Sequence, residues 1–173
     1  MDISELLKYL LPSLIVLGCT YLTIRQFLTR EEQKQRIELA MGNQKILTPI
    51  RLAAFERIVL FLERINPSNL LVRVQEPGMS AKEFHRALIA TIRAEYEHNM
   101  SQQIYISDES WDAVKTAKES ITELVNIAAQ RMSDESRSID LSKYIVQMIA
   151  QSDQHPVEDA IEKVKEEIVE ILK

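Results

Sequence analysis

The N-terminal part of the chain contains sixteen consecutive residues without a charge (YLLPSLIVLGCTYLTI), bracketed by Lys8 and Arg25. The apolar character extends to Leu6 on one side and Leu28 on the other, if the two bracketing cations reach toward lipid headgroups. A helix over Leu6 to Leu28 is roughly 34 Å long at about 1.5 Å per residue, enough for a hydrocarbon core of about 30 Å. The sequence therefore predicts a transmembrane helix at residues 9–28, with the lipid bilayer as its partner.

Three other interpretations of this segment stay open. A cleaved signal peptide is disfavoured because residues 1–8 hold two acids and one base, and no small-x-small cleavage site follows. A lipoprotein signal fits the VLGC tetrapeptide that ends at Cys19, although the following residues (TYLTIRQFL) stay apolar as in a continuing helix. The third is a buried or interfacial helix of a soluble protein.

Positive charge on the two sides of the segment predicts its orientation. Lys8 stands alone on the N-terminal side, whereas four basic residues follow on the other: Arg25, Arg30, Lys34 and Arg36. Cytoplasmic flanks of membrane helices carry the excess of lysine and arginine. We therefore expect a single-pass protein with residues 1–8 extracytoplasmic and the C-terminal part cytoplasmic.

Residues 29–47 read as a juxtamembrane helical stalk. The segment from Arg25 to Lys45 holds five basic and three acidic residues, and Gly42 with Asn43 is a plausible helix end. Its net positive charge allows electrostatic contact with anionic lipid, worth about 1 kcal/mol per basic residue near the surface.

The remaining residues, 48–173, are predicted to form a cytoplasmic all-α domain. The whole chain has only three glycines and five prolines, so its regular elements must be long. Aromatic residues make up 6% and charged residues 27%, which favours solvated helices with an aliphatic core over a β-sandwich. The expected fold class is a small bundle of about four to five helices that follows the membrane helix and its stalk.

Helix boundaries are indicated by capping residues and prolines. The expected starts are Thr48–Pro49, Ser80 with Glu83 at capping-box spacing, Ser107, either Ser138 or Asp140, and Pro156. Asn66–Pro67 should end the first of these helices, and the Ser80 helix should reach about Gln103. Glu76–Pro77–Gly78 predicts a loop. The apolar piece Leu70–Val74 before it fits either a helical turn or an extended segment.

Two apolar stripes carry further predictions. The helix after Ser107 should bury one face and hold Trp111 as a core anchor; the face comprises Trp111, Val114, Ala117, Ile121, Leu124 and Ile127. The last helix carries a heptad seam over about two heptads, formed by Val157, Ile161, Val164, Ile168 and Ile171. This seam either packs on the chain's own bundle or joins copies in a coiled-coil homo-oligomer.

Candidate chemistry is sparse. Glu95 and His98 have the Glu-x-x-His spacing by which helical bundles offer ligands to iron or manganese, but neither His85 nor His155 completes a second such motif. Glycine-rich phosphate loops need more than three scattered glycines, and one cysteine cannot form an internal disulfide. The net charge of −5 argues against nucleic acid as a partner. No catalytic, metal or cofactor residue is predicted.

Polar and aromatic residues crowd one short region near the end of the Ser80 helix. If these side chains cluster in space, they form the candidate protein-contact surface; the alternative is an ordinary polar helix end. The residues are Tyr96, His98, Asn99, Gln102, Gln103 and Tyr105.

The blocks LTPIRLAAFERIVLFLERINPSNLLVRV and AEYEHNMSQQIYIS resemble a family of short, uncharacterised bacterial proteins with one N-terminal membrane span. The resemblance covers roughly Leu47 to Ser107 plus the anchor. It implies a bacterial inner-membrane protein and assigns no activity or site residues. An anchor followed by a charged helix is also similar to the stator b subunit of rotary ATP synthases, but the prolines at positions 49, 67 and 77 depart from that protein's uninterrupted stalk.

The leading hypothesis is a membrane-anchored, non-enzymatic interaction or scaffold protein. One alternative is a metal-binding or enzymatic bundle that uses Glu95 and His98. The other is a homo-oligomeric structural protein assembled through the last helix.

Overall fold

The computed structural model describes the backbone of residues 3–171 and the side chains of residues 16–31, 34 and 45–171. The chain divides into two compact units, Met1–Thr48 and Pro49–Lys173. Among the described residues, no helix combines the length and the apolar character that a membrane span requires. The expected extracytoplasmic segment begins with two residues outside the described part, and side chains of the expected span, 9–28, are described only from Val16 onward.

Helix α1 runs without interruption from Ile3 to Ile65. The predicted helix end at Gly42–Asn43 and the predicted new start at Thr48–Pro49 are therefore wrong. An interior proline loses one hydrogen bond and crowds the carbonyl four residues earlier, which costs about 3 kcal/mol, and an interior glycine costs about 1 kcal/mol. Helix-favouring residues on both sides offset these costs. Pro49 nevertheless marks a boundary, because the division between the two units falls directly before it.

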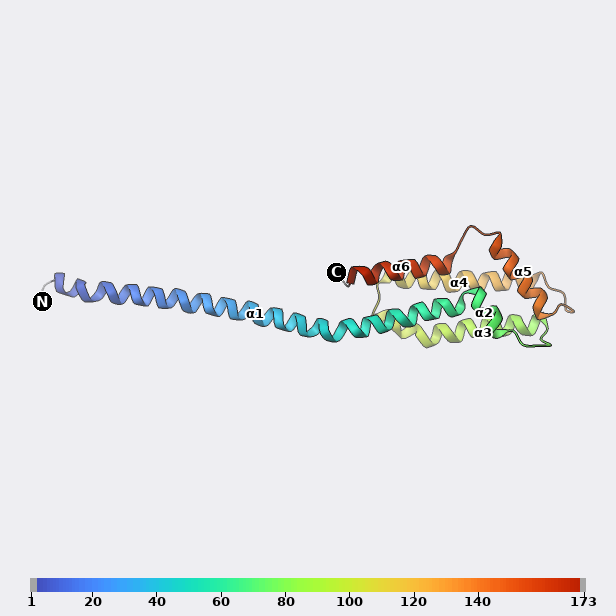
Figure 1. The fold of residues 1–173 in the computed structure, drawn as a ribbon, viewed down its shortest axis with the longest axis horizontal. Helices are drawn as coiled ribbons and strands as arrows, with labels where there is room; N and C mark the ends of the chain where they lie inside the picture. The colour runs from blue at the N-terminus through green and yellow to red at the C-terminus, as the bar shows by residue number, and fades with distance from the viewer. Residues whose placement is uncertain (1–2, 172–173) are drawn as a thin grey trace. The chain divides into compact units, whose positions relative to one another are not determined.

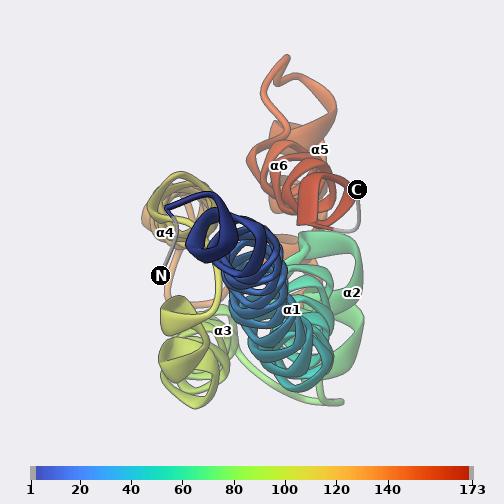
Figure 2. The same ribbon diagram turned by 90° about the vertical axis from the view of Figure 1, so that its left-hand side faces the viewer.

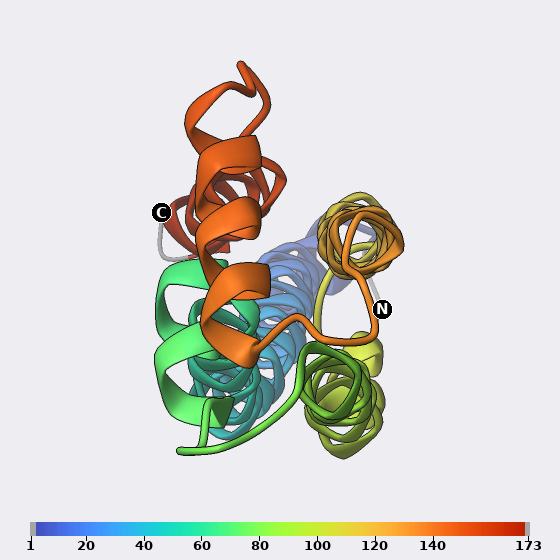
Figure 3. The same ribbon diagram turned by 90° about the vertical axis from the view of Figure 1, so that its right-hand side faces the viewer.

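The unit Pro49–Lys173 is an all-α bundle, as expected. After α1 come α2 (Pro67–Val74), α3 (Ala81–Asn99), the short 3-10 helix η1 (Met100–Ile104), α4 (Asp108–Gln130), α5 (Ser138–Ala150) and α6 (Pro156–Ile171) (Figure 1). The last part of α1, α3, α4 and α6 lie as four neighbouring helices (Figure 2). Helix α4 packs on both α3 and α6. Helix α5 crosses one end of the bundle and packs against α2, α3 and α4 (Figure 3).

Most helix starts follow the capping residues of the sequence. Asn66 ends α1 and caps α2, with Pro67 in the first turn, so the undecided piece Leu70–Val74 is helical. Ser80 and Glu83 form the expected capping box, and the Ser107 hydroxyl accepts a hydrogen bond from the Ser110 amide at the start of α4. Side-chain chemistry close to each boundary therefore marks these helix starts.

Two further boundaries, both after Pro49, differ from the prediction. Helix α5 is capped at Arg137. The Asp140 carboxylate, in the first turn of the helix, accepts a hydrogen bond from the Arg137 amide at 3.0 Å. The Ser80 helix ends at Asn99, and the chain continues to Ile104 as the tighter helix η1.

The core of this unit is aliphatic with a few aromatic anchors. Helix α1 contributes Phe55, Ile58, Phe61, Leu62 and Ile65, and these side chains lie against Phe84, Leu88 and Ile92 of α3 and Val114 of α4 in one buried cluster. Trp111 is buried as predicted and stacks on Tyr96 with ring centroids 5.6 Å apart. The last turns of α1 are therefore a structural part of the bundle.

One carboxylate joins three helices of the bundle. Glu167 of α6 accepts hydrogen bonds from the Ser107 amide at 2.9 Å and the Ser107 hydroxyl at 2.8 Å, and Arg51 of α1 donates to it at 3.1 Å. The Glu167 side chain is only 13% exposed. It thus orients the hydroxyl that caps α4 and holds α6 against α1.

Candidate functional site

The Glu95 carboxylate, one of the two groups considered for metal binding, is engaged by two guanidinium groups. Arg64 of α1 donates to it at 3.1 Å and Arg73 of α2 at 2.7 Å. Burial raises the pKa of Glu95, but the hydrogen bonds from Arg73 and Arg64 outweigh that effect, so the pKa lies below its ordinary value. A metal ion at this position would have to displace both arginines. The geometry therefore weighs against a metal site at Glu95 and His98.

We expect the Glu95 cluster to make the stability of the bundle pH-dependent. Because the pKa of Glu95 is lowered in the folded state, ionised Glu95 adds to the free energy of unfolding at pH values above its ordinary pKa of 4.5. This stabilisation is lost as the pH falls from 4.5 through the lowered pKa of the folded state. The variant Glu95→Gln should be less stable than the wild type near neutral pH, and this difference should shrink in acid. Urea unfolding across this pH range measures the effect, with Glu97→Gln on the exposed face of the same helix as the control. A difference that stays constant in acid would contradict the assignment.

The predicted contact surface does not form one exposed patch. Asn99 and Gln102 are buried, and Asn99 donates to the backbone carbonyl of Glu95. The Tyr96 ring packs between Phe61 and Trp111. His98 and Gln103 are exposed, while Tyr105 is half-buried and its backbone carbonyl accepts from Arg51. These residues are neighbours in the sequence because they form the end of α3 and the short helix η1, where polar side chains such as Asn99 make local hydrogen bonds.

The heptad seam of the last helix faces the chain's own core. Val157, Ile161 and Val164 are buried, and Ile168 and Ile171 pack partly buried against the same cluster. This arrangement favours the intramolecular alternative over an oligomer seam, since burial inside the bundle removes these side chains from contact with a second copy.

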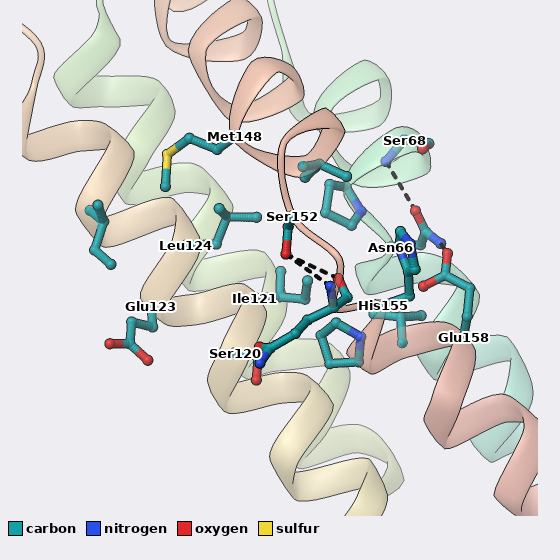
Figure 4. Close-up of a pocket in the computed structure, with 16 residues that line it drawn as sticks. Asn66, Ser68, Ser120, Ile121, Glu123, Leu124, Met148, Ser152, His155 and Glu158 are labelled. Atoms are coloured by element: carbon teal, nitrogen blue, oxygen red, sulfur yellow. Dashed lines mark hydrogen bonds between the residues drawn. The ribbon is translucent and has the colours of Figure 1, made fainter.

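A surface pocket of about 270 Å³ lies where four segments meet (Figure 4). Helix α4 supplies one wall, the end of α5 and the turn before α6 supply another, and the α1–α2 junction closes the far side. Half of the lining residues are polar and half are apolar. The large apolar side chains in the lining are Ile121, Leu124, Ile127, Met148, Ile149 and Val157.

Two of the pocket's apolar side chains lie beside the buried stripe of α4 and not in it. The sequence placed Leu124 and Ile127 on the buried face, but the core side chains in this part of α4 are Val125 and Ala128. Leu124 is only half-buried, and Ile127 is 39% exposed. Apolar residues displaced by one position from the core stripe are the signal by which the sequence marks this site.

Polar groups on the rim of the pocket are hydrogen-bonded to one another. The Asn66 side chain donates to Glu158 at 3.0 Å and accepts from the Ser68 amide at 3.2 Å. The Ser152 hydroxyl accepts from the Gln154 amide at 3.1 Å and so shapes the turn before α6. These bonds join the α1–α2 junction to α6 and order the turn before α6.

An all-α bundle with a surface pocket defines the structural class of this unit. Over residues 1–171 the chain matches a protein family described as a family of unknown function (DUF7935), and it belongs to that family. No curated protein and no solved structure matches the chain. Membership confirms the expected resemblance to an uncharacterised family, whereas the bacterial origin and the membrane span that the resemblance implied stay predictions.

Proposed function

We propose that this protein is a membrane-anchored, non-enzymatic interaction or scaffold module, with the unit Pro49–Lys173 on the cytoplasmic side of a bacterial inner membrane. The pocket is the observation that carries the proposal. Six large apolar side chains line it, and on its rim the Asn66 amide and the Ser152 hydroxyl are engaged in structural hydrogen bonds. Such a pocket can bind a protein partner by burying large side chains of that partner. Anchorage adds to this by raising the effective concentration of the pocket near membrane-bound partners.

Features of the anchor segment support the membrane part of the proposal. Large apolar side chains are exposed from Val16 to Leu28 in the described part of α1. The hydroxyls of Thr20 and Thr23 donate to backbone carbonyls one turn earlier, at 2.8 and 2.7 Å. Hydroxyls satisfied within their own helix reduce the cost of contact with hydrocarbon.

Cys19, the only cysteine, provides a test of the anchor. If residues 9–28 span a bilayer, a membrane-impermeant maleimide should leave Cys19 unlabelled in native membranes and label it after denaturation in detergent. The topology control combines Cys19→Ser with Asp134→Cys, which introduces a thiol at an exposed loop position. This thiol should react in inside-out vesicles and not in intact spheroplasts. Rapid labelling of Cys19 in intact membranes would argue against the span.

Site-specific photo-crosslinking tests the interaction module. A photoreactive amino acid at Ile127, inside the pocket, should give a defined protein adduct in cells. The matched position is Leu60 of α1, another exposed aliphatic residue, which lies outside the pocket lining and should give no such adduct. Adducts from both positions alike, or from neither, would remove the support for an interaction site at the pocket.

A further inference from the structure

The size of the pocket limits what it can hold. Pockets for whole small-molecule ligands usually measure about 300–1,000 Å³ and enclose most of the ligand. At about 270 Å³, this pocket falls below that range, and it opens at the surface where α4, the end of α5, the start of α6 and the α1–α2 junction meet. It suits one or two large side chains of a protein segment whose backbone stays outside.

The large apolar side chains of the lining determine which partner side chains fit. Ile121 and Leu124 come from α4, and Met148 comes from α5 (Figure 4). Methionine is flexible and adapts to irregular apolar shapes. Leucine, isoleucine or methionine of a partner would therefore bury against these three side chains.

The charges at the mouth determine what flanks those side chains. Among the described residues that line the pocket, the carboxylates are Glu123 and Glu158, and no lysine or arginine contributes. Glu123 projects from α4 and Glu158 from α6, on opposite sides of Ile121 and Leu124 (Figure 4). The surrounding unit, residues 49–173, adds 21 acidic against 15 basic residues, a net charge of −6.

We propose that this pocket binds a protein segment in which one or two large aliphatic side chains are flanked on both sides by lysine or arginine. The aliphatic side chains enter between α4, α5 and α6, and the flanking cations lie beside Glu123 and Glu158. A segment with acidic flanks is repelled by the same carboxylates. This inference rests on the proposed function, because it specifies the partner of the same pocket.

The test uses the full chain, methyl-labelled and held in a zwitterionic detergent, with short synthetic peptides as probes. One peptide carries two leucines flanked by lysines, the second the same leucines flanked by glutamates, and the third two serines flanked by lysines. We expect saturable shifts of the Leu124 and Met148 methyl resonances with the lysine–leucine peptide only. Equal binding of the lysine and glutamate peptides, binding of the serine peptide, or shifts produced by the detergent alone would overturn the proposal.

Paired charge variants sharpen the test. The double variant Glu123→Gln, Glu158→Gln should weaken the lysine–leucine peptide by about tenfold, since each exposed ion pair changes affinity by about twofold to fivefold. The control, Glu56→Gln with Glu97→Gln, removes two exposed carboxylates outside the pocket and should leave affinity unchanged. Equal losses of peptide affinity in both double variants would show a nonspecific charge effect and would overturn the assignment of the binding site to this pocket.

The crosslinking and peptide experiments distinguish the proposed interaction site from the proposed partner chemistry. If Ile127 crosslinks to a partner in cells while the lysine–leucine peptide leaves the methyl resonances unchanged, the interaction module stands and the proposed partner chemistry is wrong. If neither occurs, both are wrong.

Discussion

Replacing Phe61 with alanine should lower the free energy of unfolding of the bundle by about 3–5 kcal/mol, the usual cost of removing a buried aromatic ring. Phe61 is 1% exposed and contacts the Tyr96 ring at a centroid distance of 5.9 Å. The cost combines the lost burial of the ring with the cavity that remains. An effect of this size would use up much of the stability of a domain, which is usually about 5–15 kcal/mol.

The neighbouring residue offers a matched control for Phe61. Leu60 lies on the same helix and is 52% exposed, so Leu60→Ala should change stability by less than about 0.5 kcal/mol. Urea unfolding followed by tryptophan fluorescence measures both variants, because the only tryptophan, Trp111, is buried in the bundle core. Similar small losses for both would mean that the end of α1 is not part of the core.

Replacing Glu167 with alanine should lower the free energy of unfolding by about 2–3 kcal/mol. Hydrogen bonds to charged groups contribute more than neutral ones, and their loss leaves partly buried donors without an acceptor. Here the donors are the Ser107 amide, the Ser107 hydroxyl and the Arg51 guanidinium. Glu167→Gln should have a smaller effect, since its amide oxygen still accepts a hydrogen bond.

Glu166, the preceding residue, is exposed and provides the comparison for Glu167. Glu166→Ala should be within about 0.5 kcal/mol of the wild type in the same urea titration. Amide hydrogen exchange at the first turn of α4 adds a local readout, which only Glu167→Ala should accelerate. Equal behaviour of the two variants would show that the carboxylate does not support the α4 cap.

Features determined by a few neighbouring residues were predictable from the sequence. Ser80 with Glu83, Ser107, Asn66–Pro67 and Pro156 mark helix boundaries because each acts on backbone groups within one turn. The all-α class followed from the scarcity of glycine and proline and from apolar residues at helical spacing. Both kinds of signal are local, and both agree with the structure.

Features that depend on the balance of distant contacts were not predictable. Pro49 resembles a helix start, yet it lies inside α1 because the helical residues on either side outweigh its local cost. The pocket joins segments around Asn66, Leu124 and His155, which only the tertiary fold brings together. Periodicity located the apolar face of α6 but did not show whether the chain itself or a second copy covers it.

The contact between Arg51 and Glu167 has a consequence for the order in which the protein assembles during synthesis. The two residues are 116 positions apart, so the first core helix to leave the ribosome waits for the last one before this pairing can form. Contacts between distant parts of a chain slow folding, because the entropy of the intervening loop must be lost first. Until α6 arrives, the nascent bundle exposes apolar surface that a completed fold conceals, and in that interval it is most prone to aggregate.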